Sequence, residues 1–283
     1  SETFTLTVNA VNDAPTDLAL NSTSVNENSE IGTTVGTLST TDVDSDDRHS
    51  YTLVSGDGDT DNASFTINGI NLNTDDLFNY ETKPSYAIRI QTTDSESAIY
   101  AEAISITVTD MNDAPVLAGI PNQIVNEDMA KTVMLTASDE DGDFLVFSAN
   151  PDTTAIIVEI ADGTLTLTPA DNWNGTADIT VTVTDDGAGM LTDSETFTLT
   201  VNAVNDNPVL TSIGSQSTNE DTAKVVTLSA TDIENDGLTF TANSAETNVT
   251  ATVEGTSLTL TPADNWNGTA DITVTVTDDG AGM

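Results

Sequence analysis

Hydrophobic and polar residues alternate through most of this 283-residue chain. Ile179, Val181 and Val183 alternate with threonines, and the stretch 197–201 has the same pattern. Successive side chains of a β-strand point to opposite faces, so a period of two that is rich in Val and Thr predicts strands with one buried and one wet face. About seven such segments, separated by Gly, Asn and Asp turns, occur per roughly 100 residues, which is typical of a Greek-key β-sandwich.

Long segments of the sequence recur, which indicates a tandem array of one structural unit. Residues 1–13 are identical to residues 194–206, and residues 168–190 are identical to residues 261–283. Three Asn-Asp-x-Pro sequences start at Asn12, Asn112 and Asn205, which are 100 and then 93 residues apart. We therefore predict an all-β chain of tandem Greek-key β-sandwich domains in an elongated rod. The predicted boundaries are 1–14 for the last strand and linker of a preceding, truncated repeat, then 15–114, 115–207 and 208–283 for three repeats.

The third repeat is predicted to lack its last strand. In repeat two that strand is the stretch 197–201, and nothing corresponding to it follows residue 283. The stretch 4–8 is a last strand without its own domain, so residues 1–11 of another copy could fill the open position by strand addition. The alternative is that residues 1–11 make only local contacts or are disordered.

The composition adds a strong charge. The chain has 47 acidic and five basic residues, a net charge of -42, and no cysteine. Such a chain repels nucleic acid and anionic membranes, and no apolar run is long enough to span a bilayer. We expect neither nucleic-acid binding nor membrane insertion, and no disulfide contributes to the fold.

The acidic residues gather where the predicted strands end, next to the Asn-Asp-x-Pro linkers. Carboxylates that converge at such range repel strongly unless a cation neutralises them. Calcium accepts six to eight oxygen ligands of mixed carboxylate, amide and backbone type, and the linker asparagines can supply neutral oxygens. The sequence therefore predicts several Ca²⁺ ions, mainly at the junctions between neighbouring repeats. The alternative, an acidic surface for solubility or high salt, explains the charge but not its clustering.

At these residues repeat one resembles the cadherin family. The resemblance lies in the motifs 25–28 (Val-Asn-Glu-Asn), 42–44 (Asp-Val-Asp), 79–81 (Asn-Tyr-Glu) and 110–115 (Asp-Met-Asn-Asp-Ala-Pro). Repeats two and three resemble the bacterial cadherin-like repeats of giant adhesins, including those of the RTX type. Their Asn-Glu-Asp and Pro-Ala-Asp-Asn-Trp-Asn-Gly motifs carry that likeness. The resemblance implies Ig/cadherin-like sandwiches with calcium ions between them.

The resemblance also implies the ligands. The first junction would use Glu27, Asn79, Glu81, Met111, Asn112, Asp113, Ala114, Asp139, Asp141 and Asp185, with Met111 and Ala114 giving backbone oxygens. The second would use Glu127, Asp171, Asn205, Asp206, Asn207, Asp232, Glu234 and Asp278. The N-terminal pole would hold half a site made of Asn12, Asp13, Asp42, Asp44 and Asp94. Ala203 occupies the position that Asp110 fills in repeat one, so the second junction is expected to bind fewer ions or to bind them more weakly.

Other chemistry is poorly supported. The absence of cysteine and the single histidine, His49, which we expect to be an exposed loop residue, disfavour nucleophilic catalysis. Trp173 and Trp266 could stack on sugars, but both lie in an Asn-Trp-Asn-Gly turn where a ring can close one end of a sandwich. We predict no enzymatic activity.

These observations predict calcium-rigidified spacer repeats of a bacterial surface or secreted adhesin, extracellular and active in cell adhesion or biofilm formation. The partners would be neighbouring repeats of the same chain and, by strand addition, another copy. The alternative is a carbohydrate-binding or homophilic-binding module, such as an accessory region of a secreted polysaccharide-degrading enzyme.

Overall fold

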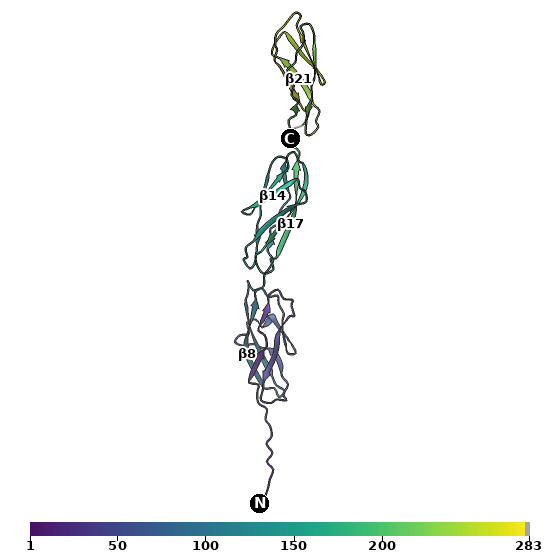
Figure 1. Ribbon diagram of the computed structural model, residues 1–283. Coiled ribbons are helices and arrows are strands. Elements are labelled where there is room, and N and C mark those ends of the chain that lie inside the picture. The colour runs from purple at the N-terminus through teal and green to yellow at the C-terminus, as the bar shows by residue number, and fades with distance from the viewer. Residues whose placement is uncertain (281–283) are drawn as a thin grey trace. The chain divides into compact units, whose positions relative to one another are not determined.

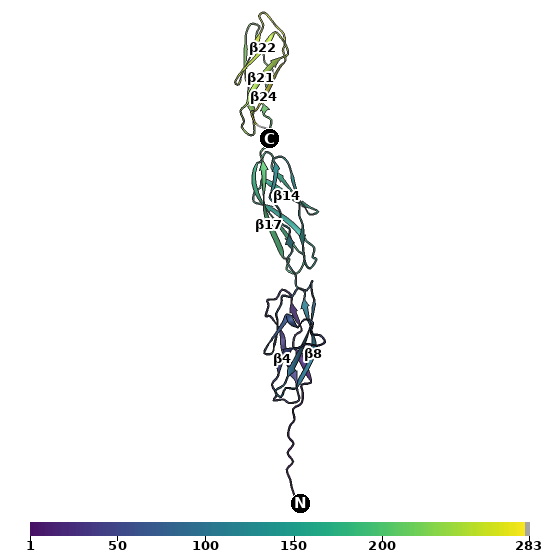
Figure 2. The same ribbon diagram turned by 180° about the vertical axis from the view of Figure 1, so that it is seen from behind.

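The computed structural model describes residues 1–280 and is built from β-strands (Figures 1 and 2). Within that range the only helix is a short 3-10 turn, η1 (Asn62–Ser64), and no helix is long and apolar enough to cross a membrane. The chain divides into two compact units. The first comprises residues 1–116, 137–146 and 183–193, and the second comprises residues 117–136, 147–182 and the described residues from 194 onward.

Residues 17–109 form a sandwich of two four-stranded sheets, in the orders β1-β3-β6-β5 and β2-β8-β7-β4. The strands are β1 (Asp17–Leu20), β2 (Ser24–Asn26), β3 (Thr34–Thr41), β4 (Ser50–Leu53), β5 (Phe65–Asn68), β6 (Asn71–Thr74), β7 (Ser85–Thr93) and β8 (Ile99–Thr109). β2 pairs in parallel with β8, and the other pairs are antiparallel. Most neighbours in each sheet, such as β3 and β6 or β2 and β8, are not consecutive in sequence, which is the crossover pattern of a Greek key.

Both sheets of this sandwich contribute to one hydrophobic core. On β7 the side chains of Tyr86, Ile88 and Ile90 are buried and alternate with partly exposed residues. Leu72 of β6 and Phe65 of β5 meet them from the opposite sheet. The period of two in the sequence therefore sets which face of each strand is buried, as predicted.

Residues 116–202 repeat the pattern with a four-stranded sheet, β10-β17-β16-β13, and a three-stranded sheet, β11-β15-β14. The strands are β9 (Val116–Leu117), β10 (Gln123–Asn126), β11 (Lys131–Met134), β12 (Ala137–Ser138), β13 (Val146–Pro151), β14 (Ile156–Ala161), β15 (Thr164–Pro169), β16 (Gly175–Thr184) and β17 (Thr192–Asn202). Ile179 and Val181 on β16, and Phe197, Leu199 and Val201 on β17, are all buried, which confirms the alternation predicted for both segments.

Residues 209–280 form sheets with fewer strands than those of residues 116–202. The strands are β18 (Val209–Leu210), β19 (Lys224–Thr227), β20 (Ala230–Thr231), β21 (Thr239–Ser244), β22 (Val249–Glu254), β23 (Ser257–Pro262) and β24 (Ile272–Thr277). β19, β23 and β22 make a three-stranded sheet, while β21 and β24 make a sheet of only two strands. The predicted repeat boundary at residue 283 lies outside the described residues.

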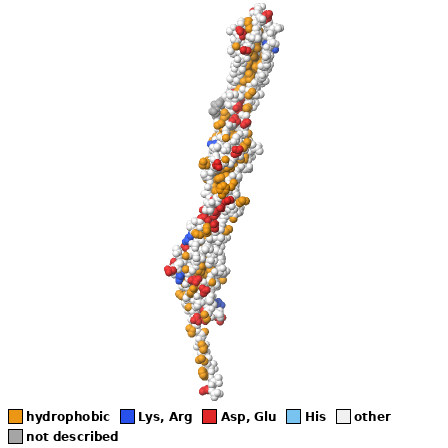
Figure 3. All heavy atoms as spheres, turned by 60° about the vertical axis from the view of Figure 1, so that its left-hand side comes forward, with side chains coloured by type: hydrophobic (Ala, Val, Ile, Leu, Met, Phe, Trp, Pro, Cys, Tyr) orange, Lys and Arg blue, Asp and Glu red, His pale blue; other side chains and the backbone are white. Residues whose placement is uncertain are grey.

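Residues 1–16, which precede β1, form no strand. Residues 1–11 leave the first sandwich as an extended segment (Figure 1), and its large hydrophobic side chains, Phe4, Leu6, Val8 and Val11, are exposed (Figure 3). The predicted last strand at 4–8 is therefore not formed here, because backbone groups of a strand need a neighbour to bond. The all-β sandwich fold itself is confirmed.

Candidate metal centre

Glu27 is the most buried acidic residue of the first unit and is held by the backbone. It follows directly after β2, and its side chain is only 2% exposed. Its two carboxylate oxygens accept hydrogen bonds from the backbone N–H groups of Tyr80 and Met111, each at 2.7 Å. Asn28 next to it has φ 56°, a left-handed conformation that Asn tolerates well. The chain thus turns away after β2 and leaves the Glu27 carboxylate between the linker and the 79–82 turn.

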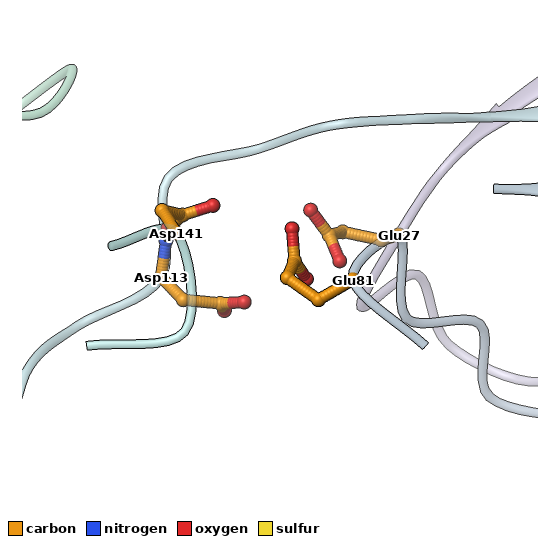
Figure 4. A group of neighbouring side chains, drawn as sticks. All are labelled: Glu27, Glu81, Asp113 and Asp141. Carbon is orange, nitrogen blue, oxygen red and sulfur yellow. Dashed lines mark hydrogen bonds between the residues drawn. The ribbon is translucent and has the colours of Figure 1, made fainter. Parts of the chain in front are cut away.

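Three further carboxylates converge on Glu27 within the first unit. Oxygens of Glu27, Glu81, Asp113 and Asp141 all lie within 4.8 Å of one another. Figure 4 shows Glu27 and Glu81 on one side and Asp113 and Asp141 on the other, with their carboxylates directed toward a common centre. We call these four residues the first acidic cluster. Two oxygens that bind one calcium at about 2.3–2.6 Å can be at most about 5 Å apart, so this spacing fits a shared ion.

Burial and mutual repulsion disfavour the ionised form of carboxyl groups in and beside the first acidic cluster. Burial raises the pKa of Asp113, and the nearby carboxylates of Glu27 and Asp141 raise it further. Burial likewise raises the pKa of Asp110, again together with Asp141 and Glu27. Both causes disfavour the ionised form, and a bound cation reverses them.

Buried carboxylate oxygens without a hydrogen-bond partner lie in the same region. Asp113 Oδ2 and Asp139 Oδ2 are buried and have no hydrogen-bond partner among the described residues. Oxygens of Asp139, Asp141 and Asp143 form a second group within 4.8 Å, which shares Asp141 with the first acidic cluster. Buried acceptors without a donor are rare in folded proteins, and a cation satisfies them. The residues present therefore fit a hard cation with oxygen ligands.

Two linker contacts recur three times along the chain. In the first, a linker asparagine donates its side-chain N–H to an aspartate at the end of a strand: Asn12 to Asp94 (3.0 Å), Asn112 to Asp185 (3.2 Å) and Asn205 to Asp278 (3.2 Å). In the second, the next backbone N–H donates to an acidic side chain: Asp13 to Asp44 (2.7 Å), Asp113 to Asp141 (2.7 Å) and Asp206 to Glu234 (3.3 Å). Each Asn-Asp-x-Pro linker thus binds the loops that follow it in the same way.

The second unit contains a related set, which we call the second acidic cluster: Glu127, Asn205, Asp206, Asp232, Glu234 and Asp236. Glu127 is 2% exposed and accepts the backbone N–H of Val204 at 2.5 Å. Oxygens of Asp232, Glu234 and Asp236 lie within 4.8 Å of one another. Asn205 Oδ1, Asp206 Oδ2 and Asp232 Oδ2 are buried without a hydrogen-bond partner in the described part of the chain. Burial raises the pKa of Asp206, and Glu234 adds to the effect.

A third group lies at the N-terminal end of the first sandwich and includes Asp42, Asp44 and Asp47. The backbone N–H of Asp44 and the His49 ring both bond Asp42, and together they lower its pKa. The side-chain N–H of Asn12 is the main cause of the lowered pKa of Asp94. His49 was expected to be an exposed loop residue. Instead its side chain is 13% exposed and lies 3.1 Å from Asp42 Oδ2.

Some predicted ligands lie elsewhere. Asp171 is exposed. In the same loop, the side-chain N–H of Asn174 donates to the Glu127 carboxylate at 3.5 Å. Asn79 uses its amide oxygen within its own turn, where it accepts the N–H of Thr82. Asn207, Met111 and Ala114, the last two predicted to bind through backbone oxygens, are exposed linker residues.

The sequence reasoning missed Asp143, Asp236 and Asp47 as members of these groups. A signal was present for two of them, because acidic residues occur at every second position in 139–143 and 232–236. It also missed Gly187, where an added Cβ would lie 1.6 Å from Asn112 Oδ1 and 2.1 Å from Asp143 Oδ2. Only a residue without a side chain allows the linker asparagine to approach this closely.

The tryptophans pack onto glycines of their own turns. Ring atoms of Trp173 would lie 3.2 Å from a Cβ placed on Gly175, and those of Trp266 would lie 2.8 Å from one on Gly268. Both rings are partly buried. This packing supports the structural interpretation of the Asn-Trp-Asn-Gly turn over sugar stacking.

Comparison with known proteins agrees with this fold. Residues 111–202 match the family described as "Cadherin-like domain", and residues 205–283 match the family described as "Bacterial Ig domain". Residues 111–202 are thus similar to a cadherin-like domain, as the sequence motifs predicted, whereas residues 205–283 are similar to a bacterial Ig domain. A comparison with curated protein sequences finds no match.

Solved structures with a similar fold include several protocadherins. They include the protocadherin gammaB7 EC3-6 cis-dimer structure, at 19% identity and a TM-score of 0.54, with 95% of this chain and 70% of that chain covered. Another is human protocadherin-24 EC1-2, Form II, at 18% identity and a TM-score of 0.50, with 67% and 98% covered. The chain spans 60% of the protocadherin Gamma B2 domain 1-5 structure and 48% of the protocadherin GammaB4 extracellular domain.

Proposed function

We propose that this chain is a calcium-rigidified spacer from a bacterial surface or secreted adhesin of the RTX type. The observation that carries the proposal is the repeated acidic cluster with buried, unpartnered oxygens beside each Asn-Asp-x-Pro linker. Cadherin-like domains in general bind calcium, and the two matched families are of a non-enzymatic, adhesion type. Both facts support a mechanical role outside the cell over a catalytic one.

Calcium would act as a clamp between neighbouring repeats. Glu27 and Glu81 come from predicted repeat 15–114, Asp113 from the linker at its end, and Asp141 from predicted repeat 115–207. A single ion bound to all four would cancel their repulsion and tie two repeats to one linker. The second acidic cluster would act likewise for predicted repeats 115–207 and 208–283. The predicted domain boundaries are part of this proposal.

The affinity of such sites fits a function outside the cell. Extracellular calcium modules bind at roughly 10⁻⁴–10⁻³ M, which exceeds the calcium concentration inside cells. The chain would then be exported with flexible linkers and would stiffen into a near-rigid rod outside, where it could hold an adhesive domain away from the surface during cell adhesion or biofilm formation.

Small-angle X-ray scattering in millimolar calcium and then in chelator tests the clamp. We expect a single long maximum dimension in calcium and a shorter, broader distribution of distances in chelator. Asp113→Asn should reproduce part of the chelator result while calcium is present, because it replaces a charged carboxylate of the first acidic cluster by a neutral amide that binds calcium more weakly.

The matched control is Glu159→Gln, which removes one charge from an exposed position of β14 and belongs to neither cluster. It should scatter like the wild-type chain in both conditions. An identical distance distribution with and without calcium would exclude the clamp.

A further inference from the structure

The two glutamates that directly follow β2 and β10 occupy equivalent places at the two junctions. Glu27 and Glu127 are each 2% exposed. Each accepts a hydrogen bond from a linker backbone N–H, from Met111 at 2.7 Å in the first case and from Val204 at 2.5 Å in the second. Both linkers thus bind a buried carboxylate in the same way, so the surroundings of the two glutamates can be compared residue by residue. We call the place beside this buried carboxylate the glutamate position.

The first junction surrounds its glutamate position with acidic side chains. The first acidic cluster brings four carboxylates within 4.8 Å of one another there (Figure 4). A fifth carboxyl group, that of Asp110, is close enough for Asp141 and Glu27 to add to the effect of burial in raising its pKa. Five acidic groups therefore share one small region of the first junction.

The second junction has fewer acidic groups at its glutamate position. Ala203 occupies the place of Asp110, and in the described part of the chain no group of three or more acidic side chains within 4.8 Å includes Glu127. The loop beside Glu127 contributes an amide instead, since the side-chain N–H of Asn174 donates to Glu127 Oε2 at 3.5 Å. A neutral side chain therefore lies beside this glutamate, where the first junction has the carboxylate of Glu81.

Other acidic residues of the second junction do not restore the missing charge. Glu234 and Glu127 add to the effect of burial in raising the pKa of Asp206, so these three carboxylates remain close together. Asp128 also affects Asp206, but it is exposed, and its Oδ1 accepts the backbone N–H of Asn172 at 2.9 Å. It therefore caps its own loop. Three carboxylates thus remain at the glutamate position, compared with five at the first junction.

A neighbouring place, which we call the aspartate position, is alike at both junctions. Its acidic groups, each within 4.8 Å, are Asp139, Asp141 and Asp143 at the first junction and Asp232, Glu234 and Asp236 at the second. The linker asparagine donates to a strand-end aspartate at 3.2 Å in both cases. An added Cβ on Gly187 or Gly280 would likewise lie 1.6 Å from the asparagine Oδ1. The difference between the junctions is therefore confined to the glutamate position.

We propose that the second junction binds calcium more weakly than the first at the glutamate position, so that the two linkers stiffen in two steps as the calcium concentration rises. Calcium affinity depends on the number of charged ligands and on the rigidity of the site, and both favour the first junction. The change from Asp110 to Ala203 predicts a weaker second junction, and the structure assigns the weakness to this position and adds Asn174 to its causes. The inference rests on the proposed calcium clamp.

This difference makes the second linker a calcium-dependent hinge. At an intermediate calcium concentration the first linker would be held at both of its positions, while the second would be held firmly only at its aspartate position. The chain would then bend at residues 203–207 and stay straight at residues 110–114. Only a higher calcium concentration would remove this hinge.

Amide hydrogen exchange of the full chain, measured by mass spectrometry from about 10⁻⁶ to 10⁻² M calcium, follows both linkers in one experiment. The backbone N–H groups of Met111 and Asp113 report on the first linker, because both donate to acidic side chains. Those of Val204 and Asp206 report on the second linker in the same way. We expect the second linker to become protected at an about tenfold higher calcium concentration than the first.

Exchanging the differing residues tests the cause. Asn174→Asp combined with Ala203→Asp should lower the calcium midpoint of the second linker to that of the first and leave the first unchanged. Asn267→Asp is the matched control, because it makes the same change in the identical Asn-Trp-Asn-Gly turn, outside both acidic clusters, and should move neither midpoint. Glu81→Asn combined with Asp110→Ala should raise the midpoint of the first linker to that of the second.

The outcomes separate this inference from the clamp itself. Equal midpoints for the two linkers of the wild-type chain overturn the two-step response and leave the clamp intact. Midpoints that differ but do not move in either double variant show that other residues set the difference, and they overturn the assignment to the glutamate position. Exchange that is independent of calcium at both linkers overturns the clamp and the inference together. The melting temperature of each variant checks that it is folded.

Discussion

At the scale of single residues, the tightest constraint on the first acidic cluster is Gly187. Replacing it by alanine would place a Cβ within 2.1 Å of oxygens of both Asn112 and Asp143, so the linker amide must move. We expect Gly187→Ala to break the bond from Asn112 to Asp185 and to lower calcium affinity about 10–100-fold, as loss of supporting contacts around a metal typically does. Isothermal titration calorimetry measures this.

The control for that variant is Gly119→Ala. The nearest atom to its added Cβ lies 3.9 Å away, which is ordinary van der Waals contact. Its calcium affinity should equal that of the wild-type chain. If Gly187→Ala also binds calcium normally, the linker asparagine does not support the site.

Asp141 allows a test in which the sign of the effect changes with calcium. Without calcium, Asp141→Asn removes repulsion from Glu81 and Asp113 yet keeps an oxygen for the Asp113 N–H, so the melting temperature should rise. With calcium it replaces a charged ligand by a neutral, weaker one, so the melting temperature should fall. Each kcal/mol corresponds to about 2–4 °C for a unit of this size.

Differential scanning calorimetry in calcium and in chelator checks the reversal. Glu159→Gln, far from the clusters in sequence and exposed, should shift the two melting temperatures equally. A shift of Asp141→Asn in the same direction under both conditions would favour an acidic surface that serves only solubility.

Much of the candidate site could be predicted at this scale, and the exceptions have physical reasons. Glu27, Asp113 and Asp141 were found because short motifs beside strand ends place acids at a shared pole. Asp171 was predicted to be a ligand from its position in a motif. The backbone of its turn instead directs the side chain of Asn174, three residues later, toward Glu127, and the motif alone does not reveal this. Gly187 carries no charge, so no reasoning about ligands could identify it.

At the scale of elements, the identical segments 1–13 and 194–206 show how much of strand formation depends on tertiary neighbours and how much on local sequence. Local propensity is the same for both, yet only residues 194–202 form part of a strand, β17, because β10 and β16 lie beside them. Alternation could therefore predict which face of a strand is buried. It could not predict whether a strand forms, since that depends on partners that tertiary structure supplies.

This pair of segments gives a matched test of burial. Phe197→Ala should destabilise its sandwich by about 3–5 kcal/mol, the usual cost of removing a buried phenyl ring. Phe4→Ala, within the same local sequence, should leave stability unchanged at dilute concentration, because Phe4 is 85% exposed. Urea unfolding of both variants measures the difference. Equal losses would mean that residues 1–11 already pack against the fold in the single chain.

At the scale of the whole molecule, the net charge of -42 acts mainly at the clusters. At physiological salt the screening length is about 8 Å, so carboxylates scattered over the surface hardly interact. Oxygens within 4.8 Å of one another are not screened, and these lie beside the linkers. The cost of the acidic composition is therefore concentrated at the points where the proposed domains join.

Calcium should accordingly protect the linkers from proteolysis. A protease that cleaves before aspartate must draw the linker into its active site, which requires the bonds from Asp113 to Asp141 and from Asp206 to Glu234 to open. At a calcium concentration ten times the dissociation constant, linkage lowers the population of the opened linker about tenfold. We expect early cleavage before Asp113 and Asp206 in chelator, and mass spectrometry of the first fragments identifies both cuts.

Asp141→Asn separates the two linkers in the same experiment. In calcium it should expose Asp113 to cleavage while Asp206 stays protected, because Asp141 belongs to the first acidic cluster and the adjoining group of Asp139 and Asp143, but not to the second acidic cluster. Cleavage before Asp113 that is equally fast with and without calcium in the wild-type chain would show that the ion does not hold this linker. Protection of both linkers in the variant would instead place the decisive ligands elsewhere, with Asp139 and Asp143 the first to examine.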